Sequence, residues 1–599
     1  MNRRRVLPVL LVSGALSGVL ALAGCTGVPR SSSPEPIQTI NDAEIANSVA
    51  PPPRGADQRS IVQGFLDANG AADANHNGAR AFLTPQARNR WQDQNGATII
   101  DTARVGNVSS KENVVVTGNP VGTLAANGAF TPELSGDGTG LGGDTQPTSR
   151  TFQLRKVAGQ WRINSMNPAG GLLLTSQEFA NQYKQRVLYF YDTTETRLVP
   201  DYRWTPDYSP NVLANWLAAQ LEVGNTAVPD ESNEFPAQTA HVTVTIGRQT
   251  DQGLPPTRID IPGSSQLAPG TKSRLATELA ATLSAPAVPG VGDMQITDGG
   301  QPVTIPAVHS TTFSAVTLHN PAAEPTPVGA PYYIDSKGQV VDVQGQPLQG
   351  RLGQYGLQSI ALADRGQGQR GLLAAGVHGE APHQYVDIGT ASKLSTVRLP
   401  LGKQLPDGPF SRPDWAPGLK EAWIGDGTQL LSITDDGAVT IVPIENASKV
   451  TGQIIAVRFS PDGTRVAIVL KSGPSSQSVY VGEVDRQASG AVQVENLQQI
   501  SPDQISVQDV GWELTNRLYV IGTDLVADEP YVYSVDPDGA EWKIAYQTVG
   551  LLPEAPDSLA VGEGEYVVVT AGTTLWEYNT TWIPLNGDNT RGTSPTYIS

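Results

Sequence analysis

The chain has 599 residues, of which 39% are hydrophobic, and a formal net charge of -18 at pH 7. This length exceeds what one hydrophobic core usually organises, so we expect several domains. The strong acidity disfavours nucleic acid and anionic lipid headgroups as partners, because like charges repel. We therefore expect no nucleic-acid partner and no basic surface that binds a membrane.

The amino-terminal residues have the pattern of an export signal that ends in a lipidation site. A basic cluster at residues 3–5 precedes an apolar run at 6–23, which ends in Leu22-Ala23-Gly24-Cys25 with the only cysteine of the chain. Such a run is typical of a signal peptide, and the last four residues form a lipobox. We predict a lipoprotein signal peptide at 1–24, cleavage between Gly24 and Cys25, and S-diacylglycerol and N-acyl (palmitate) lipidation of Cys25, which anchors the chain stably.

Two alternatives concern this segment. A run of about 18 apolar residues can just span a bilayer, but Pro8 and the small residues weaken a transmembrane interpretation. The arginines at 3–5 also loosely resemble a twin-arginine signal, although the rest of that motif is missing. An ordinary basic region is favoured, and the choice between Sec and twin-arginine export stays open.

The residues after Cys25 predict a tether and then a first α+β domain. Residues 25–54 are rich in Pro and Ser and lack a periodic apolar pattern, so we predict an extended tether. In the segment 55–175, Ile61, Phe65 and Leu66 have helical spacing. Strands are expected at three further places, residues 114–116, 152–157 and 161–163. Helices followed by a curved antiparallel hairpin resemble the NTF2-like fold.

A second α+β domain is predicted at 176–318. Thr175 and Glu178 form a capping box that predicts a helix continuing through Phe179 and Tyr183. Strands are expected at 187–192, 241–246 and 294–296, and helices at 211–221 and 271–283. In the first of these helices Val212, Leu213, Trp216 and Leu217 are expected to face inward. This order of elements resembles the GerMN domain.

A Pro-rich linker at 319–331 separates these helical segments from a region with strand periodicity, residues 332–599. Similar strand runs recur around positions 360, 415, 459, 512 and 559, at intervals of 55, 44, 53 and 47 residues. Such spacing is typical of four-stranded propeller blades with variable loops. We predict an all-β propeller with five visible blades, and a sixth is possible if residues 332–343 close the ring with the C-terminal blade.

Several short motifs resemble chemical sites but fit structural roles better. Residues 73–78 look like half of a calcium loop, but position 12 is Thr84, which cannot supply the bidentate carboxylate. Residues 138–143 fit GxGxxG without the strand and helix that a nucleotide site needs. The acidic groups at 435–437, 461–463 and 536–539 fall where blade hairpins must turn. We expect turns and a flexible loop at these places.

The six histidines do not form a metal motif. Only His378 and His383 lie close in sequence, and surface loop positions are expected for all six, which are His76, His241, His309, His319, His378 and His383. No GxSxG elbow or P-loop occurs, and an acylated Cys25 cannot serve as a catalytic thiol. The sequence predicts no catalytic residue, no cofactor and no metal.

The order of lipobox, tether, NTF2-like segment, GerMN-like segment and irregular propeller resembles the actinobacterial lipoprotein LpqB family. The strings SPDGTRVAIVL at 460–470 and GLLLTSQEFANQYKQRVLYFYD at 171–192 support this resemblance. It implies a non-enzymatic lipoprotein on the extracytoplasmic face of the cell membrane. It further implies contact with the extracytoplasmic sensor domain of a two-component histidine kinase (MtrB-type), with effects on cell division and envelope homeostasis.

Two other functions remain open at this point. An envelope hydrolase with a site in the propeller channel is one, because propellers host unrelated functions. A structural lipoprotein that binds the cell wall is the other. The binding surface, the direction of regulation, the oligomeric state and any small ligand of the α+β domains do not follow from the sequence.

Overall fold

A computed structural model describes residues 50–599 except for short internal gaps. The gaps are 71–75, 110–111, 135–146, 226–233, 237–240, 251–252, 285, 319–328, 355, 365–370, 380–382, 398–408, 446–450, 563–565, 586 and 588–590. The predicted signal peptide, Cys25 and the GxGxxG-like motif at 138–143 lie outside the described residues, as do residues 73–75 of the calcium-like motif and residues 319–328 of the linker. All contacts given below lie within one compact unit, residues 47–599.

The first region combines short helices with two four-stranded sheets. Its helices are α1 (Gln58–Asn69), α2 (Asn77–Arg80), α3 (Pro85–Arg90) and α4 (Ser176–Gln182). One sheet has the order β5 (Phe130–Pro132), β4 (Pro120–Leu124), β1 (Ala97–Ile100), β8 (Leu172–Thr175). The other has the order β2 (Arg104–Val105), β3 (Asn113–Gly118), β6 (Thr148–Val157), β7 (Gln160–Asn167). This is the α+β arrangement that the sequence predicted.

Helix α1 shows why this region folds as it does. Asp57 caps the helix, because its carboxylate accepts a hydrogen bond of 2.8 Å from the Ser60 backbone N–H. The apolar stripe Ile61, Phe65 and Leu66 is buried, as its helical spacing predicted. The stripe packs on the sheets, where Phe65 meets Phe152 of β6 with ring centroids 5.8 Å apart.

The capping box at the start of α4 is confirmed. Thr175 accepts from the Glu178 N–H at 3.2 Å, and Glu178 accepts from the Thr175 N–H at 2.7 Å. The predicted continuation through Tyr183 is wrong: α4 ends at Gln182, and Tyr183 begins strand β9 (Tyr183–Tyr191). The reason is a nine-residue antiparallel ladder in which β9 pairs with β10 (Leu198–Pro206).

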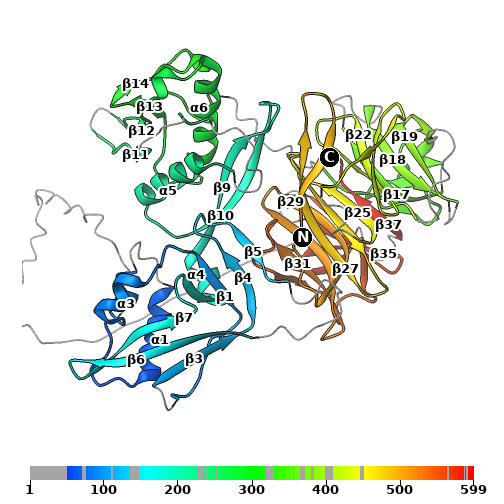
Figure 1. The fold of residues 1–599 in the computed structure, drawn as a ribbon. Helices are drawn as coiled ribbons and strands as arrows, with labels where there is room; N and C mark the ends of the chain where they lie inside the picture. Colours follow the sequence, from blue (N-terminus) through cyan, green and yellow to red (C-terminus); the bar gives the residue numbers. More distant parts are fainter. Residues whose placement is uncertain are drawn as a thin grey trace, which may run out of the picture. The chain divides into compact units, whose positions relative to one another are not determined.

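The second region places two helices on a mixed four-stranded sheet (Figure 1). The helices are α5 (Pro210–Val223) and α6 (Pro269–Leu283), and the sheet has the order β11 (Thr243–Thr245), β12 (Thr257–Asp260), β13 (Met294–Asp298), β14 (Gln301–Pro302). Short 3₁₀ turns occur at η1 (Ser264–Gln266) and η2 (Pro306–Val308). The prediction for Val212 is wrong, because this side chain is 43% exposed. Leu213 and Leu217 are buried as predicted, together with Leu221, and Trp216 is partly buried against the same core.

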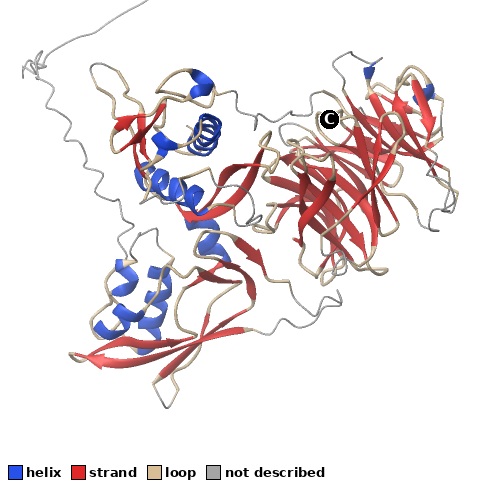
Figure 2. Ribbon diagram, turned by 45° about the horizontal axis from the view of Figure 1, so that its top comes forward, coloured by secondary structure: helices blue, strands red, loops and turns tan. Residues whose placement is uncertain are grey.

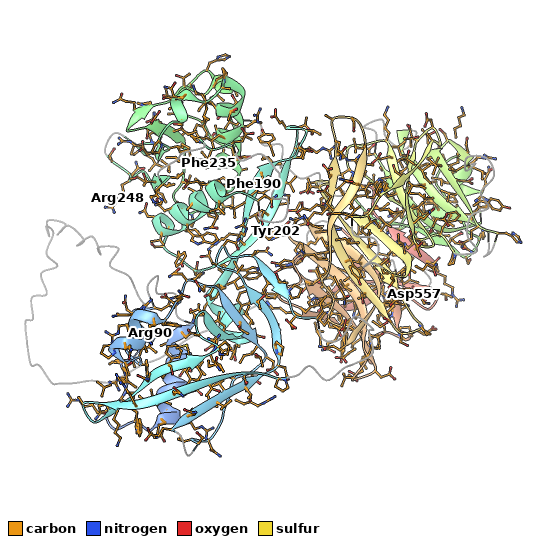
Figure 3. All side chains as sticks on the ribbon, viewed as in Figure 1. Arg90, Phe190, Tyr202, Phe235, Arg248 and Asp557 are labelled. Carbon is orange, nitrogen blue, oxygen red and sulfur yellow. The ribbon has the colours of Figure 1, made fainter. Side chains whose placement is uncertain are left out.

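The hairpin β9–β10 contributes to the cores of both α+β regions. Tyr183 and Trp204 belong to the core of the first region, and Leu188 and Phe190 belong to the core of the second. Phe235, labelled with Phe190 in Figure 3, is another member of that core. The predicted boundary between residues 175 and 176 stays a prediction, but one hairpin clearly supplies side chains to both cores.

The region from residue 332 onward contains six sheets and is built almost wholly of strands (Figure 2). Five sheets have four strands in sequential antiparallel order: β17 (Leu357–Ala363) to β20 (Lys393–Thr396), β21 (Asp414–Trp415) to β24 (Val439–Val442), β25 (Gln453–Phe459) to β28 (Val492–Gln499), β29 (Ile505–Leu514) to β32 (Lys543–Gln547), and β33 (Pro556–Val561) to β36 (Thr581–Pro584). The middle strands are β18 (Leu373–His378), β19 (Tyr385–Thr390), β22 (Glu421–Asp426), β23 (Gln429–Thr434), β26 (Arg465–Lys471), β27 (Gln477–Arg486), β30 (Arg517–Asp524), β31 (Glu529–Val535), β34 (Val567–Ala571) and β35 (Thr574–Asn579). A 3₁₀ turn, η3 (Arg351–Gly353), precedes β17.

The repeat positions found in the sequence each fall in the first strand of a sheet. Positions 360, 415, 459, 512 and 559 lie in β17, β21, β25, β29 and β33. A sixth sheet consists of β16 (Val340–Val341), β15 (Tyr332–Asp335) and β37 (Gly592–Thr596). The possible ring closure by residues 332–343 is therefore confirmed, with one strand supplied by residues 592–596. Beyond β37, the Ser599 N–H donates to the Leu362 carbonyl at 3.0 Å, which joins the sixth sheet to the first blade.

Candidate functional site

The strongest site prediction, lipidation of Cys25, concerns a residue outside the described part of the chain and stays a prediction. Within residues 50–599, apart from the gaps given above, no helix has the length and apolar content needed to cross a membrane.

The first structural candidate is the cavity among the innermost propeller strands. This is the place where the sequence analysis kept an enzyme site as an alternative. It has a volume of about 100 Å³, and its lining residues come from six sheets, for example Ile360, Arg412, Phe459, Trp512, Leu559 and Tyr597. The lining is largely apolar and aromatic around a small set of charged groups. Those groups determine what the channel is able to do.

Asp509 does not itself line the cavity, but it connects two charged lining residues, Arg412 and Arg458. Its side chain is 3% exposed, and it forms ion pairs with Arg412 and, at 3.4 Å, with Arg458. The same carboxylate accepts from the backbone N–H groups of Val510 at 3.0 Å and Leu559 at 2.9 Å. Each carboxylate oxygen therefore has two donors, and one side chain connects the inner strands of three blades with the segment before β21.

Arg412 extends this network to the sixth sheet. Its guanidinium donates to the carbonyls of Leu559 at 3.2 Å and Pro595 at 2.7 Å, whereas its Nε is buried without a partner among the described residues. Burial lowers the pKa of Arg412 to about 10, and it raises the pKa of the neighbouring Asp414 to about 6. Asp414 accepts from the Phe459 N–H at 2.8 Å. The channel charges are thus used to hold the blades together.

The histidine predictions need two corrections, for His76 and for His378, which ends strand β18 and is not a surface loop residue. His76 is buried, and its Nδ1 lies 3.2 Å from Asp93, whose other oxygen accepts from Arg80 at 2.6 Å. A buried carboxylate needs such partners, which explains why this histidine is not a surface loop residue. His241, His309 and His383 are exposed as predicted, and His319 lies outside the described residues. His378 is partly buried, with its Nδ1 3.4 Å from Asp387.

Among the described residues, no three His, Cys, Asp or Glu side chains form a group able to hold a metal ion.

The predicted blade turns are present: Gly437, Gly463 and Gly539 have φ of 92°, 71° and 84°, which glycine adopts without strain. Asp462 uses its carboxylate within its own turn, where it accepts from the Thr464 N–H at 3.0 Å.

The second structural candidate is the joint at which strand β10 contacts the propeller. Tyr202, labelled in Figure 3, is buried, and its hydroxyl donates to the Thr515 carbonyl. Arg465 of β26 donates to the Pro200 carbonyl, and its guanidinium carbon lies 4.4 Å from the centre of the Tyr202 ring. Such a cation–π contact is strongest where water is excluded.

The hairpin β9–β10 makes two more contacts with the propeller, one from β10 and one from its turn. The Trp204 indole N–H donates to Asp538 at 2.8 Å. Asp538 lies in the predicted turn at 536–539, so this residue serves both the turn and the joint. At the tip of the hairpin, the Thr193 hydroxyl donates to Asp485 at 3.1 Å. Together these bonds fix β10 along the third and fourth blades.

A cavity of about 230 Å³ lies at this joint. Its walls come from β5, β10, β27, β28 and the turn after β31, and they include Phe130, Tyr202, Val481, Glu483 and Asp538. Strand β28 is irregular beside it, because a register shift lies between Val481 and Glu483 and Asn496 has a φ of 46°. Bulges of this kind often lie next to binding sites, where they redirect side chains.

Sequence reasoning missed every residue of this joint. One signal was present: Arg465 and Glu483 are charged residues inside or beside apolar strand runs, and buried charges of this type need partners. Arg465 has its partners Pro200 and Tyr202 more than 250 positions away in the chain, so no local pattern connects them.

Comparison with known proteins agrees with this architecture. A family model described as the N-terminal domain of lipoprotein LpqB matches residues 51–180, and one described as the lipoprotein LpqB beta-propeller domain matches residues 335–597. Lipoprotein LpqB of Mycolicibacterium smegmatis is 29% identical over 490 residues, which cover 78% of this chain and 79% of the relative. The Nocardia farcinica protein of the same name is 25% identical over 603 residues, with coverage of 95% and 94%.

Solved structures with similarity include TolB from Acinetobacter baumannii and a puromycin hydrolase mutant. TolB has a TM-score of 0.32 and 13% identity over 47% of this chain and 70% of that chain. The hydrolase has a TM-score of 0.30 and 13% identity over 46% of this chain and 42% of that chain.

The fold and the family matches define the class: a multidomain, mainly β protein with α+β regions ahead of a C-terminal propeller. The chain belongs to the LpqB family of lipoproteins. The family's name implies anchoring to a membrane by a lipid.

Proposed function

We propose that this lipoprotein is anchored through Cys25 to the extracytoplasmic face of the cell membrane and modulates a two-component sensor histidine kinase of the MtrB type. In this proposal the chain binds the extracytoplasmic sensor domain of the kinase and has no catalytic activity, cofactor or metal of its own. Its influence on cell division and envelope homeostasis then follows from kinase output.

The observation that carries the proposal is the lipobox at Cys25, followed by a Pro- and Ser-rich tether ahead of a family-matched body. A tether of about 30 residues reaches at most roughly 100 Å when fully extended. Confinement to one membrane surface raises the effective concentration of the two partners, so a weak contact becomes populated. The choice of kinase rests on the family resemblance.

The propeller supports a binding role. Its channel charges are engaged with each other and with backbone groups, as Asp509 and Arg412 illustrate. A ring closed in this way is a rigid platform, and its blade loops are free to vary in sequence and present a broad contact surface.

In-cell crosslinking of the tagged full chain, followed by mass spectrometry of membrane partners, tests the proposal. We expect one dominant crosslinked partner, a histidine-kinase sensor domain. Crosslinks only to wall polymers, or to no protein, would contradict it and favour wall binding. A metal bound at about one per chain after dialysis would favour the hydrolase alternative instead.

The anchor has its own test. Cys25→Ala should move the protein from the membrane to the soluble fraction and weaken kinase output, while the melting temperature of the body stays unchanged. Cys25 is the only cysteine, so no disulfide is lost by this change. Unchanged membrane retention and unchanged output would remove the anchoring argument.

A further inference from the structure

The joint between β10 and the propeller contains a cavity whose chemistry is not used by the fold. Its volume is about 230 Å³. This space suits a small molecule, since pockets for drug-sized ligands begin at about 300 Å³.

Glu483 lines this cavity with a single ionic partner, Arg465. The residue is 8% exposed, and among the described residues no group donates a hydrogen bond to its carboxylate. The nearest cation is Arg465, at 3.7 Å, which is beyond hydrogen-bond distance. Arg465 is already engaged by the Pro200 carbonyl and the Tyr202 ring. The Glu483 side chain is 11% exposed and lines the cavity, so its oxygens are able to accept hydrogen bonds from a molecule bound there.

The electrostatic surroundings of Glu483 favour a positive ligand. Burial raises the pKa of Glu483 to about 7; Arg465 opposes this rise, and the negative charges of Asp201 and Glu495 add to it. Asp538 brings a further carboxylate to the cavity wall. Arg203, the other nearby cation, is paired with Asp201 at 2.6 Å. The acids around the cavity therefore outnumber the cations.

The geometry also restricts the kind of cation. No group of three acids or histidines able to hold a metal ion occurs in the part of the chain that the structure describes. Glu483 lacks hydrogen-bond donors, and an ammonium group supplies three. Phe130 and Val481 line the same cavity and offer apolar contact to a short hydrocarbon chain. The site thus matches a ligand with a charged amine at one end and an alkyl portion at the other.

We propose that this cavity binds a small alkylammonium ligand, with the ammonium group donating to Glu483 and the alkyl chain lying against Phe130 and Val481. The ligand contacts both β5 of the first region and β27 of the propeller, so binding stabilises the joint between these two regions. This inference does not depend on the kinase partner.

Calorimetric titration of the detergent-purified full chain with n-butylammonium, and separately with n-butanol, tests the proposal. We expect saturable binding of the amine and none of the alcohol, which has a similar shape but no charge. Glu483→Gln keeps the shape of the side chain and removes its charge, so it should weaken amine binding by about tenfold to a hundredfold. Binding to the wild-type chain should also weaken as the pH falls below 7, where Glu483 becomes protonated.

Glu495→Gln is the matched control. Glu495 already accepts from Gln493 at 2.6 Å, so this variant should change the affinity by less than about threefold. A second variant, Thr131→Phe, fills the rim of the cavity from an exposed position of β5 without changing charge. It should abolish binding while the melting temperature is unchanged, which keeps the test valid if Glu483→Gln folds poorly.

Three results would overturn the proposal: no saturable binding of the amine, equal binding of amine and alcohol, or affinity unchanged in both Glu483→Gln and Thr131→Phe.

Discussion

The propeller channel and the β10 joint both bury charges, but they treat them differently. In the channel, each oxygen of Asp509 has two donors. At the joint, Glu483 has no hydrogen-bond donor among the described residues and only a distant cation. A buried ion pair seldom adds net stability, yet breaking one is costly. The comparison therefore separates charges that hold the fold together from a charge that is available to a ligand.

The largest expected effect comes from removing the centre of the channel network. Asp509→Asn leaves Arg412 and Arg458 buried without their carboxylate, which should lower the free energy of unfolding by about 3–5 kcal/mol. Denaturation in urea measures this loss.

The control for that variant is Glu541→Gln, which breaks a solvent-accessible pair with Lys543 and should change stability by about 0.5 kcal/mol or less. If Asp509→Asn is as mild as its control, the channel charges do not hold the blades together.

Tyr202→Phe should have the next largest effect. It removes the hydroxyl that donates to the Thr515 carbonyl at a buried position, so the unfolding free energy should fall by about 1–2 kcal/mol. Hydrogen exchange around residue 515 should rise in the same variant. Tyr566→Phe, at a residue that is 60% exposed, is the control and should leave the unfolding free energy and the hydrogen exchange nearly unchanged. If the two variants have equal effects on these quantities, Tyr202 has no role in the joint.

The joint should also give stability a dependence on pH. Burial raises the pKa of Glu483 from 4.5 to about 7 in the folded chain, so the folded state holds this proton more tightly than the unfolded chain. The contribution is fully present below about pH 4.5 and is lost as the pH rises through 7. The Glu483→Gln variant should therefore gain stability relative to the wild type between pH 5 and pH 8. Parallel stability curves would show that Glu483 is not buried as described.

The smallest effect is expected at the exposed tip of the hairpin. Thr193→Ala removes the hydrogen bond to Asp485 and should cost about 0.5 kcal/mol or less, because water replaces an exposed partner. Thr194→Ala removes a bond within the hairpin, to Asp192 at 2.9 Å, and serves as the comparison. If Thr193→Ala lowers the unfolding free energy more than Tyr202→Phe does, the main contact with the propeller is at the hairpin tip and not at the buried strand.

Local patterns predicted the elements of this molecule well. The strand runs around positions 360, 415, 459, 512 and 559 each fall in the first strand of a sheet, and the helix expected at 271–283 is α6 (Pro269–Leu283). The capping box at Thr175 also predicted the start of α4, because capping depends on residues three positions apart. Such signals are contained in the sequence spacing itself.

Contacts between distant segments were not predictable in this way. Tyr202 and Thr515 are 313 positions apart, and no period links them. Likewise, the end of α4 at Gln182 was decided by the ladder between β9 and β10, and tertiary pairing of this kind overrides local helix propensity. The cavity around Glu483 arises only where these distant strands meet.

The most direct test of the proposed function measures kinase phosphorylation in vesicles that contain the full-length sensor kinase and the lipidated chain. We predict that the phosphorylation rate differs from that of vesicles without the chain. In vesicles with the Cys25→Ala chain at the same concentration, the rate should lie close to that of vesicles without the chain. An identical rate in all three preparations would contradict the account.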